Sequence, residues 1–187
     1  MSFGDNPELD AVNEMLAAIG EDPIGGLELM PPSANTALHL LRVTARDMQE
    51  EGHWFNTEKG YVLLPDTDGY ILIPPGILRF EGEDRDVVDR GGRLYDLENK
   101  TLTFTSGVSL EVILNLPWRD LPPVARRYFT AIATERFVEA FPGSPGVTEA
   151  RNRNLLRARA AFQRAEVDNA NHNLLQNQGV LNMMRRS

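Results

Sequence analysis

The sequence predicts an α+β protein in which a discontinuous four-helix bundle carries an inserted antiparallel β lobe. Apolar residues recur at helical spacing near both ends of the 187-residue chain, whereas the middle holds short β-prone segments between turn sequences. Helices at the two ends can share a core only if the strands form a separate lobe. We therefore expect a helical body over 1–52 and 118–175, a β lobe over 53–117 and a flexible tail over 176–187.

Two helices are expected before the β lobe. Asp5 or Asn6 can cap the first helix, and Pro7 suits its first turn because no N–H bond is lost there. Gly20 can end it in the left-handed conformation. Its apolar residues have helical spacing: Leu9, Val12, Leu16 and Ile19. The second helix is expected over 33–52, with an apolar stripe of Leu38, Leu41, Ala45 and Met48.

The helical spacing of the apolar residues ends near Trp54, where strands are expected to begin. The expected strands are 54–57, 60–64, 70–73, 77–80, 86–90, 93–97, 101–104 and 108–114. Asp66 to Gly69 resembles the opening of a calcium loop, but isoleucines occupy the sixth and twelfth positions, where that loop needs glycine and glutamate. A turn explains this segment, and Gly91-Gly92 is expected to be a two-residue hairpin turn.

Two more helices are expected after the β lobe. One begins near Leu121 with prolines in its first turn. The other is expected over 144–175, with an apolar stripe of Val147, Leu155, Ala158, Phe162 and Ala165. The polar, Asn- and Gln-rich end of the chain shows little periodicity, so we expect it to be ordered by a partner.

Composition and charge limit the classes of protein to consider. There are no cysteines, which excludes disulfides and thiolate metal sites, and no apolar run is long enough to cross a membrane. A polar, acidic start is not a signal peptide, so we expect assembly in the cytoplasm. Residues 1–150 hold 12 Lys/Arg and 25 Asp/Glu, a net charge of −13, whereas residues 151–187 hold 7 Arg and 2 acids, a net charge of +5. This asymmetry indicates either an acidic partner for the basic end or a helix with a solvated arginine face.

Motifs for catalysis or cofactor binding are missing from the sequence. The histidines are far apart and lack ligand spacing, and no glycine-rich nucleotide loop is present. We therefore expect no catalytic residue, cofactor or metal. Abundant carboxylates leave open an alternative, a carbohydrate-degrading enzyme that uses a pair of carboxylates. A third alternative is a nucleic-acid-binding module that uses the arginine-rich last helix.

Trp54 and Trp118 bracket the strand region. They could stack on a ligand, but large rings at such places more often bury their area where lobes meet, about 150–250 Å² each. We expect lobe-junction packing for both.

Four blocks of sequence, in order, resemble the tail tubular protein A family, the head-to-tail adaptors of short-tailed podophages. They are AVNEMLAAIGEDP at 11–23, GHWFN at 52–56 followed by Glu58, Gly60 and LPD at 64–66, DRGG at 89–92 with LYD at 94–96, and Leu121-Pro122 with Ala133, Arg136, Phe137 and FPG at 141–143. The resemblance spans about residues 8–150 and departs most in the last 35 or so.

The resemblance implies a structural virion tail protein: a dodecameric ring with a channel for DNA, assembled in the host cytoplasm. One face would meet the portal protein and the other the tail nozzle, tubular protein B, with tail fibres near that junction and no membrane partner. The basic end is then expected to reach the portal. Its candidate portal-facing residues are Arg151, Arg153, Arg157, Arg159, Arg185 and Arg186.

Overall fold

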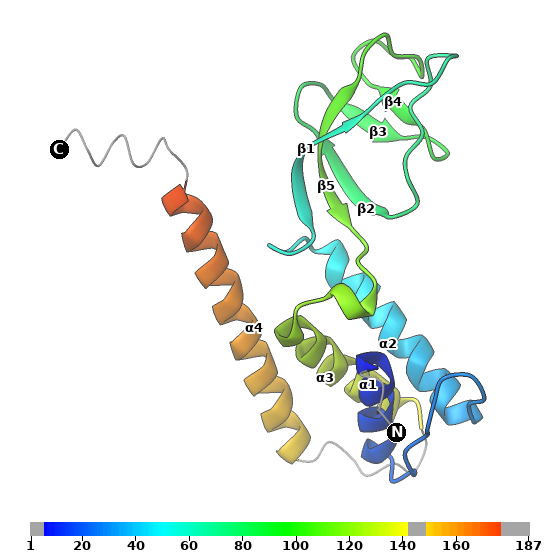
Figure 1. The fold of residues 1–187 in the computed structure, drawn as a ribbon, viewed down its shortest axis with the longest axis vertical. Helices are drawn as coiled ribbons and strands as arrows, with labels where there is room; N and C mark the ends of the chain where they lie inside the picture. The colour runs from blue at the N-terminus through cyan, green and yellow to red at the C-terminus, as the bar shows by residue number, and fades with distance from the viewer. Residues whose placement is uncertain (1–5, 142–148, 177–187) are drawn as a thin grey trace, which may run out of the picture. The chain divides into compact units, whose positions relative to one another are not determined.

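The computed structural model describes residues 6–141 and 149–176, with side chains up to residue 170. The helices are α1 (Pro7–Ala18), α2 (Pro32–Glu50), the short 3₁₀ helix η1 (Trp118–Asp120), α3 (Pro123–Glu139) and α4 (Glu149–Gln176). The strands are β1 (Thr57–Leu63), β2 (Ile77–Gly82), β3 (Val87–Asp89), β4 (Leu94–Asp96) and β5 (Val108–Leu114). The predicted α+β class is confirmed (Figure 1).

The chain forms two compact units. One, the helical unit, comprises Met1–Asp47 and Pro117–Ser187, and the other, the β unit, is the single segment Met48–Leu116. Helix α2 begins in the helical unit, and its last residues belong to the β unit.

The helical unit is built around a core of small and large apolar side chains from three helices. Asn6 caps α1 as predicted, because its Oδ1 accepts hydrogen bonds from the backbone N–H of Glu8 and Leu9, each at 3.3 Å. The buried core residues come from α1, α2 and α3: Ala11, Val12, Met15, Leu16, Ala34, Ala37, Leu38, Leu41, Ala133 and Phe137. Trp118 packs against this core from η1.

Helix α4 packs against α3 in the antiparallel sense. The Arg151 Nε atom lies 3.5 Å from a carboxylate oxygen of Glu135 near the end of α3. Further along, the ring of Phe162 lies 5.1 Å from that of Tyr128 and 5.9 Å from that of Phe129. Because α4 has 28 residues and α3 has 17, α4 continues beyond the start of α3 (Figure 1).

The β unit has a three-stranded antiparallel sheet in the order β1-β5-β2 and a separate hairpin, β3-β4. Side chains alternate along β5, so that Val108, Leu110 and Val112 are buried while Ser109 and Glu111 lie on the other face. The buried residues of β5 share a core with Val87 of β3, Leu94 of β4, and Ile71 and Phe104 from the connecting segments. The hairpin and these segments therefore cover the inner face of the sheet.

The predicted turns of the β unit are confirmed. Asp66 Oδ1 accepts hydrogen bonds from the N–H of Asp68 at 3.0 Å and of Tyr70 at 2.8 Å, and Gly69 has a φ of +85°. Gly91 and Gly92, with φ of +68° and +78°, form the tip of the β3-β4 hairpin.

Three predicted strands are wrong. Residues 54–56 form a turn and only Thr57 belongs to a strand, because the buried Asn56 side chain bonds the backbone of His53, Gln49 and Leu114. Residues 70–73 and 101–104 form only isolated bridges. Prolines at 74 and 75 cannot extend a ladder, and the Thr101 hydroxyl accepts a hydrogen bond from the N–H of Thr103 instead.

The third helix begins at Pro123 rather than Leu121, and the predicted start of the fourth, 144–148, lies outside the described residues.

Candidate assembly surfaces

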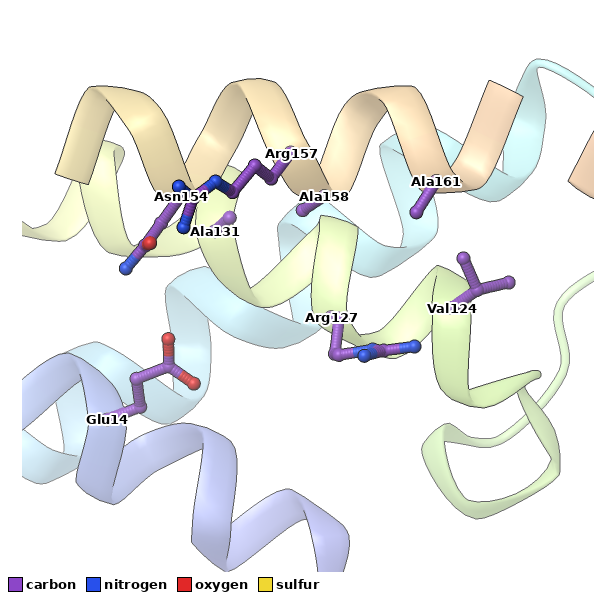
Figure 2. Close-up of a pocket in the computed structure, with 8 residues that line it drawn as sticks. All are labelled: Glu14, Val124, Arg127, Ala131, Asn154, Arg157, Ala158 and Ala161. Atoms are coloured by element: carbon purple, nitrogen blue, oxygen red, sulfur yellow. The ribbon is translucent and has the colours of Figure 1, made fainter. Parts of the chain in front are cut away.

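A hollow of about 410 Å³ lies between α1, α3 and α4 of the helical unit. Figure 2 shows the residues around it: Glu14 from α1, Val124, Arg127 and Ala131 from α3, and Asn154, Arg157, Ala158 and Ala161 from α4. The alanines contribute little volume, which leaves the space between the helices open. A second hollow, of about 420 Å³, shares Glu14 and Arg127 and extends to Asp10 and Trp118.

Glu14 lines both hollows, and partial burial of its carboxyl raises its pKa, although much of the side chain remains exposed. Asp10 is the only other carboxylate at either hollow, and it precedes Glu14 by one helical turn. Two carboxylates side by side on one helix do not face each other across a substrate, as glycoside hydrolysis requires. Among the described residues, no group of His, Asp and Glu could hold a metal ion. Neither of these two hollows therefore offers the pair of facing carboxylates that a carbohydrate-degrading tail component would need.

The arginines predicted to face the portal are placed differently from one another. Arg151 lies against α3 beside Glu135, with only 13% of its side chain exposed. Arg153 is 60% exposed and pairs with Glu149 one turn earlier at 3.4 Å. Arg157 lines the first hollow, and Arg159 is exposed on another side of α4. Arg185 and Arg186 lie outside the described residues.

The two tryptophans lie in different units. Trp118 Nε1 donates a hydrogen bond to the Pro7 carbonyl at 3.0 Å, which ties η1 to the start of α1. Trp54 packs edge-on against Phe55, with ring centroids 5.0 Å apart. Their role at a lobe junction stays a prediction.

The tip of the β3-β4 hairpin carries a feature that the sequence pattern did not reveal. The Arg90 guanidinium stacks over the Tyr95 ring at 3.4 Å, and that of Arg93 lies over the Tyr70 ring at 4.5 Å. Both arginines are exposed. Leu72, which bridges to Arg93, is 59% exposed. We call these five residues the tip surface. Spacing alone cannot pair Arg93 with a tyrosine in another segment of the chain.

The outer face of the three-stranded sheet is acidic. Glu81 of β2 lies directly opposite Glu111 of β5, which is an unfavourable pairing of like charges. Lys59 of β1 offsets it, with its Nζ atom 2.8 Å from Glu111. Glu83 accepts hydrogen bonds from the Ser109 hydroxyl at 2.6 Å and the Gly60 N–H at 3.1 Å, and these bonds lower its pKa.

Exposed apolar side chains adjoin this acidic face. Val62 of β1 pairs with Ser109 and is 57% exposed, and Leu64 is 72% exposed. We call Lys59, Val62, Leu64, Glu81, Glu83 and Glu111 the outer sheet face. Arg79, two residues before Glu81 on β2, is exposed as well.

Two compact units, a helix α4 that continues beyond the start of α3, and exposed charged surfaces are features of an assembly protein. In agreement with this, the tail tubular protein family matches residues 9–172, which include most of both units. The chain belongs to this family and is a structural component of a phage tail. Among curated proteins, Tail tubular protein A of Klebsiella phage KP34 is 35% identical over 129 residues, covering 68% of this chain and 69% of the relative. The resemblance predicted from the sequence blocks is thus confirmed.

No described helix is long and apolar enough to cross a membrane.

Proposed function

We propose that this protein is the head-to-tail adaptor of a short-tailed phage. It would form a dodecameric ring that joins the portal protein to the tail nozzle, tubular protein B, lets DNA pass, and lies near the tail fibres. The observation that carries the proposal is the 35% identity with Tail tubular protein A of Klebsiella phage KP34. Such a role needs no catalytic residue or cofactor, and assembly would take place in the host cytoplasm.

The helices would act as one discontinuous bundle, with residues 53–117 as an inserted lobe and 176–187 as a tail. Two observations support this arrangement. Helices α1, α2 and α3 share one buried core. Helix α4 joins α3 through Phe162, which is 3% exposed and lies against two aromatic rings.

Helix α4 and the residues that follow would contact the portal. The Arg151–Glu135 and Phe162–Tyr128 contacts define the antiparallel alignment, which leaves the part of α4 after Val167 beyond the start of α3. Val167 itself is 58% exposed. Asparagine is a poor helix former, and residues 169–176 include three asparagines. The end of α4 therefore needs a partner to be a stable helix.

The channel wall would be acidic. DNA is attracted to proteins mainly through Lys and Arg that neutralise phosphates. The net charge of −13 over residues 1–150 would therefore repel DNA weakly and let it slide. A channel lined mainly by arginine would contradict this.

The test is binding to tailless heads that carry the portal. The full chain should load as a ring, visible by cryo-electron microscopy, and a chain lacking 176–187 should keep its circular dichroism spectrum but bind more weakly. The triple variant Arg153→Ala, Arg157→Ala, Arg159→Ala should also bind more weakly. Arg46→Ala, an exposed arginine on α2, serves as the control.

Each outcome bears on a different part of the proposal. If the full chain does not bind the heads, the adaptor function is wrong. If the chain lacking 176–187 and the triple variant both bind as tightly as the full chain, the function stands and the portal contact lies elsewhere.

A further inference from the structure

We infer that neighbouring copies of this chain contact each other through their β units, with the tip surface of one copy on the outer sheet face of the next. This inference rests on the proposed ring and names a contact that closes it. The two surfaces match in charge and in apolar character, and they lie on opposite sides of one core.

The tip surface is a preorganised cation pair. A guanidinium stacked on an aromatic ring keeps its plane fixed while the N–H groups at its edge remain free to donate. Arg90 and Arg93 are both held in this way, at 3.4 Å and 4.5 Å from the tyrosine rings. Within the described part of the chain, neither forms an ion pair with a carboxylate. Two guanidinium groups held in fixed planes can bind two carboxylates, each through two parallel N–H···O hydrogen bonds.

The outer sheet face supplies two carboxylates of this kind. Lys59 forms its ion pair with Glu111 and also attracts the Glu83 carboxylate, but among the described residues neither Glu81 nor Glu83 forms an ion pair of its own. Hydrogen bonds from Ser109 and Gly60 fix the Glu83 carboxylate in place. The repulsion between Glu81 and Glu111 across the strands would be relieved by an incoming cation.

Apolar contacts would accompany the ion pairs. Leu72 is exposed beside Arg93, and Val62 and Leu64 are exposed beside Ser109 and Glu83. Covering such side chains removes apolar area from water, which favours association. The apolar side chains could form the centre of the contact and the ion pairs its polar rim, as in contacts between proteins.

The acidity of the β unit favours a second copy over DNA as the occupant. Residues 48–116 contain 6 Lys/Arg and 13 Asp/Glu, a net charge of −7, which disfavours the approach of a duplex. The same excess of carboxylates makes another copy a suitable partner for Arg90 and Arg93.

The placement of the two surfaces suits a ring. The hairpin and the sheet cover the same core from opposite sides, through Leu94 on one and Leu110 on the other. A contact between two different surfaces of identical subunits is heterologous, and repeated contacts of this kind close into a ring when the rotation allows it.

Charge reversal tests the contact on portal-bearing heads. The tip variant Arg90→Glu, Arg93→Glu and the face variant Glu81→Arg, Glu83→Gln should each lower the fraction of heads with a complete ring by at least about ten-fold, since each replaces attraction with repulsion. Gln at 83 keeps one acceptor oxygen for the Gly60 N–H, and its NH2 group can donate to the Ser109 hydroxyl, which can accept as well as donate. A chain that carries all four changes should form rings again. Arg46→Glu, a matched reversal of an exposed arginine on α2 in the helical unit, should form rings like the unmodified chain.

Circular dichroism and thermal melting show first that each variant is folded. If both variants load like the unmodified chain, the inference is wrong and the adaptor function stands. If the chain with all four changes does not recover ring formation, the two surfaces do not meet each other. If the unmodified chain never loads, the proposed function itself is wrong.

Discussion

The two units differ in how far apart in the sequence their core residues lie. In the helical unit, Val12 and Leu16 of α1 share a core with Phe137 of α3, which follows the β unit in the sequence. In the β unit, the whole core comes from one continuous segment, from Leu63 to Val112. The helical unit therefore forms only after a long loop is closed, whereas the β unit needs only contacts within its own segment.

This difference has a consequence for stability. Two cores made from separate side chains can unfold in separate transitions, because truncating a residue in one removes no contact from the other. Core mutations in each unit can therefore show whether the two units unfold independently.

The largest effect is expected for Phe137→Ala. Phe137 is fully buried, and its ring lies 4.7 Å from that of Phe141. Its truncation should destabilise the helical unit by about 3–5 kcal/mol, because transfer and cavity costs add. Thermal melting followed by circular dichroism should show the helical transition moving to lower temperature. Leu156→Ala, at a residue 57% exposed, is the control. A single transition that moves as a whole would contradict two independent units.

Leu110→Ala is the corresponding change in the β unit. Leu110 is fully buried in the centre strand β5, and its loss should cost about 2–5 kcal/mol. Hydrogen exchange of β1, β2 and β5 amides should accelerate while that of α1 and α3 stays unchanged. Leu64→Ala, at a residue 72% exposed, should leave both sets unchanged. Faster exchange in α1 and α3 would mean that the units unfold together.

Asn56→Ala is expected to have a smaller effect, confined to the β unit. Asn56 Oδ1 accepts from the His53 N–H at 2.8 Å, and its Nδ2 donates to the Gln49 and Leu114 carbonyls, each at 2.9 Å. Alanine leaves buried backbone groups without this partner, at a cost of about 1–3 kcal/mol. Urea unfolding measures the loss, with Asn152→Ala, an exposed asparagine on α4, as the control. Equal midpoints for both variants would contradict the role of Asn56.

The sequence predicted the helices better than the strands for a physical reason. The α1 cap and the apolar spacing of α2 are local signals. Trp54 and Phe55 are β-prone, but the turn there depends on hydrogen bonds from Asn56 to Leu114, far along the chain.

Contacts of surface residues with distant segments of the chain were equally hard to predict from the sequence. The hairpin tip was predictable from Gly91 and Gly92, whereas the stacking of Arg93 on Tyr70 joins two segments. Likewise, the arginine count of α4 did not reveal that Arg151 lies against Glu135.

The smallest effect is expected for Glu14→Gln, in the helical unit alone. Partial burial raises the pKa of Glu14 above its ordinary value of 4.5, so the folded state binds a proton that the unfolded state has already released. Stability from this group is therefore fully present below pH 4.5 and is lost as the pH rises through the folded pKa. Glutamine removes that loss, so the variant should melt at a slightly higher temperature than the unmodified chain at neutral pH and at the same temperature in acid. Glu139→Gln, at an exposed carboxylate on α3, serves as the control. A Glu14→Gln variant less stable at neutral pH would mean that the carboxylate is held by favourable contacts, and that the two hollows do not destabilise its charge.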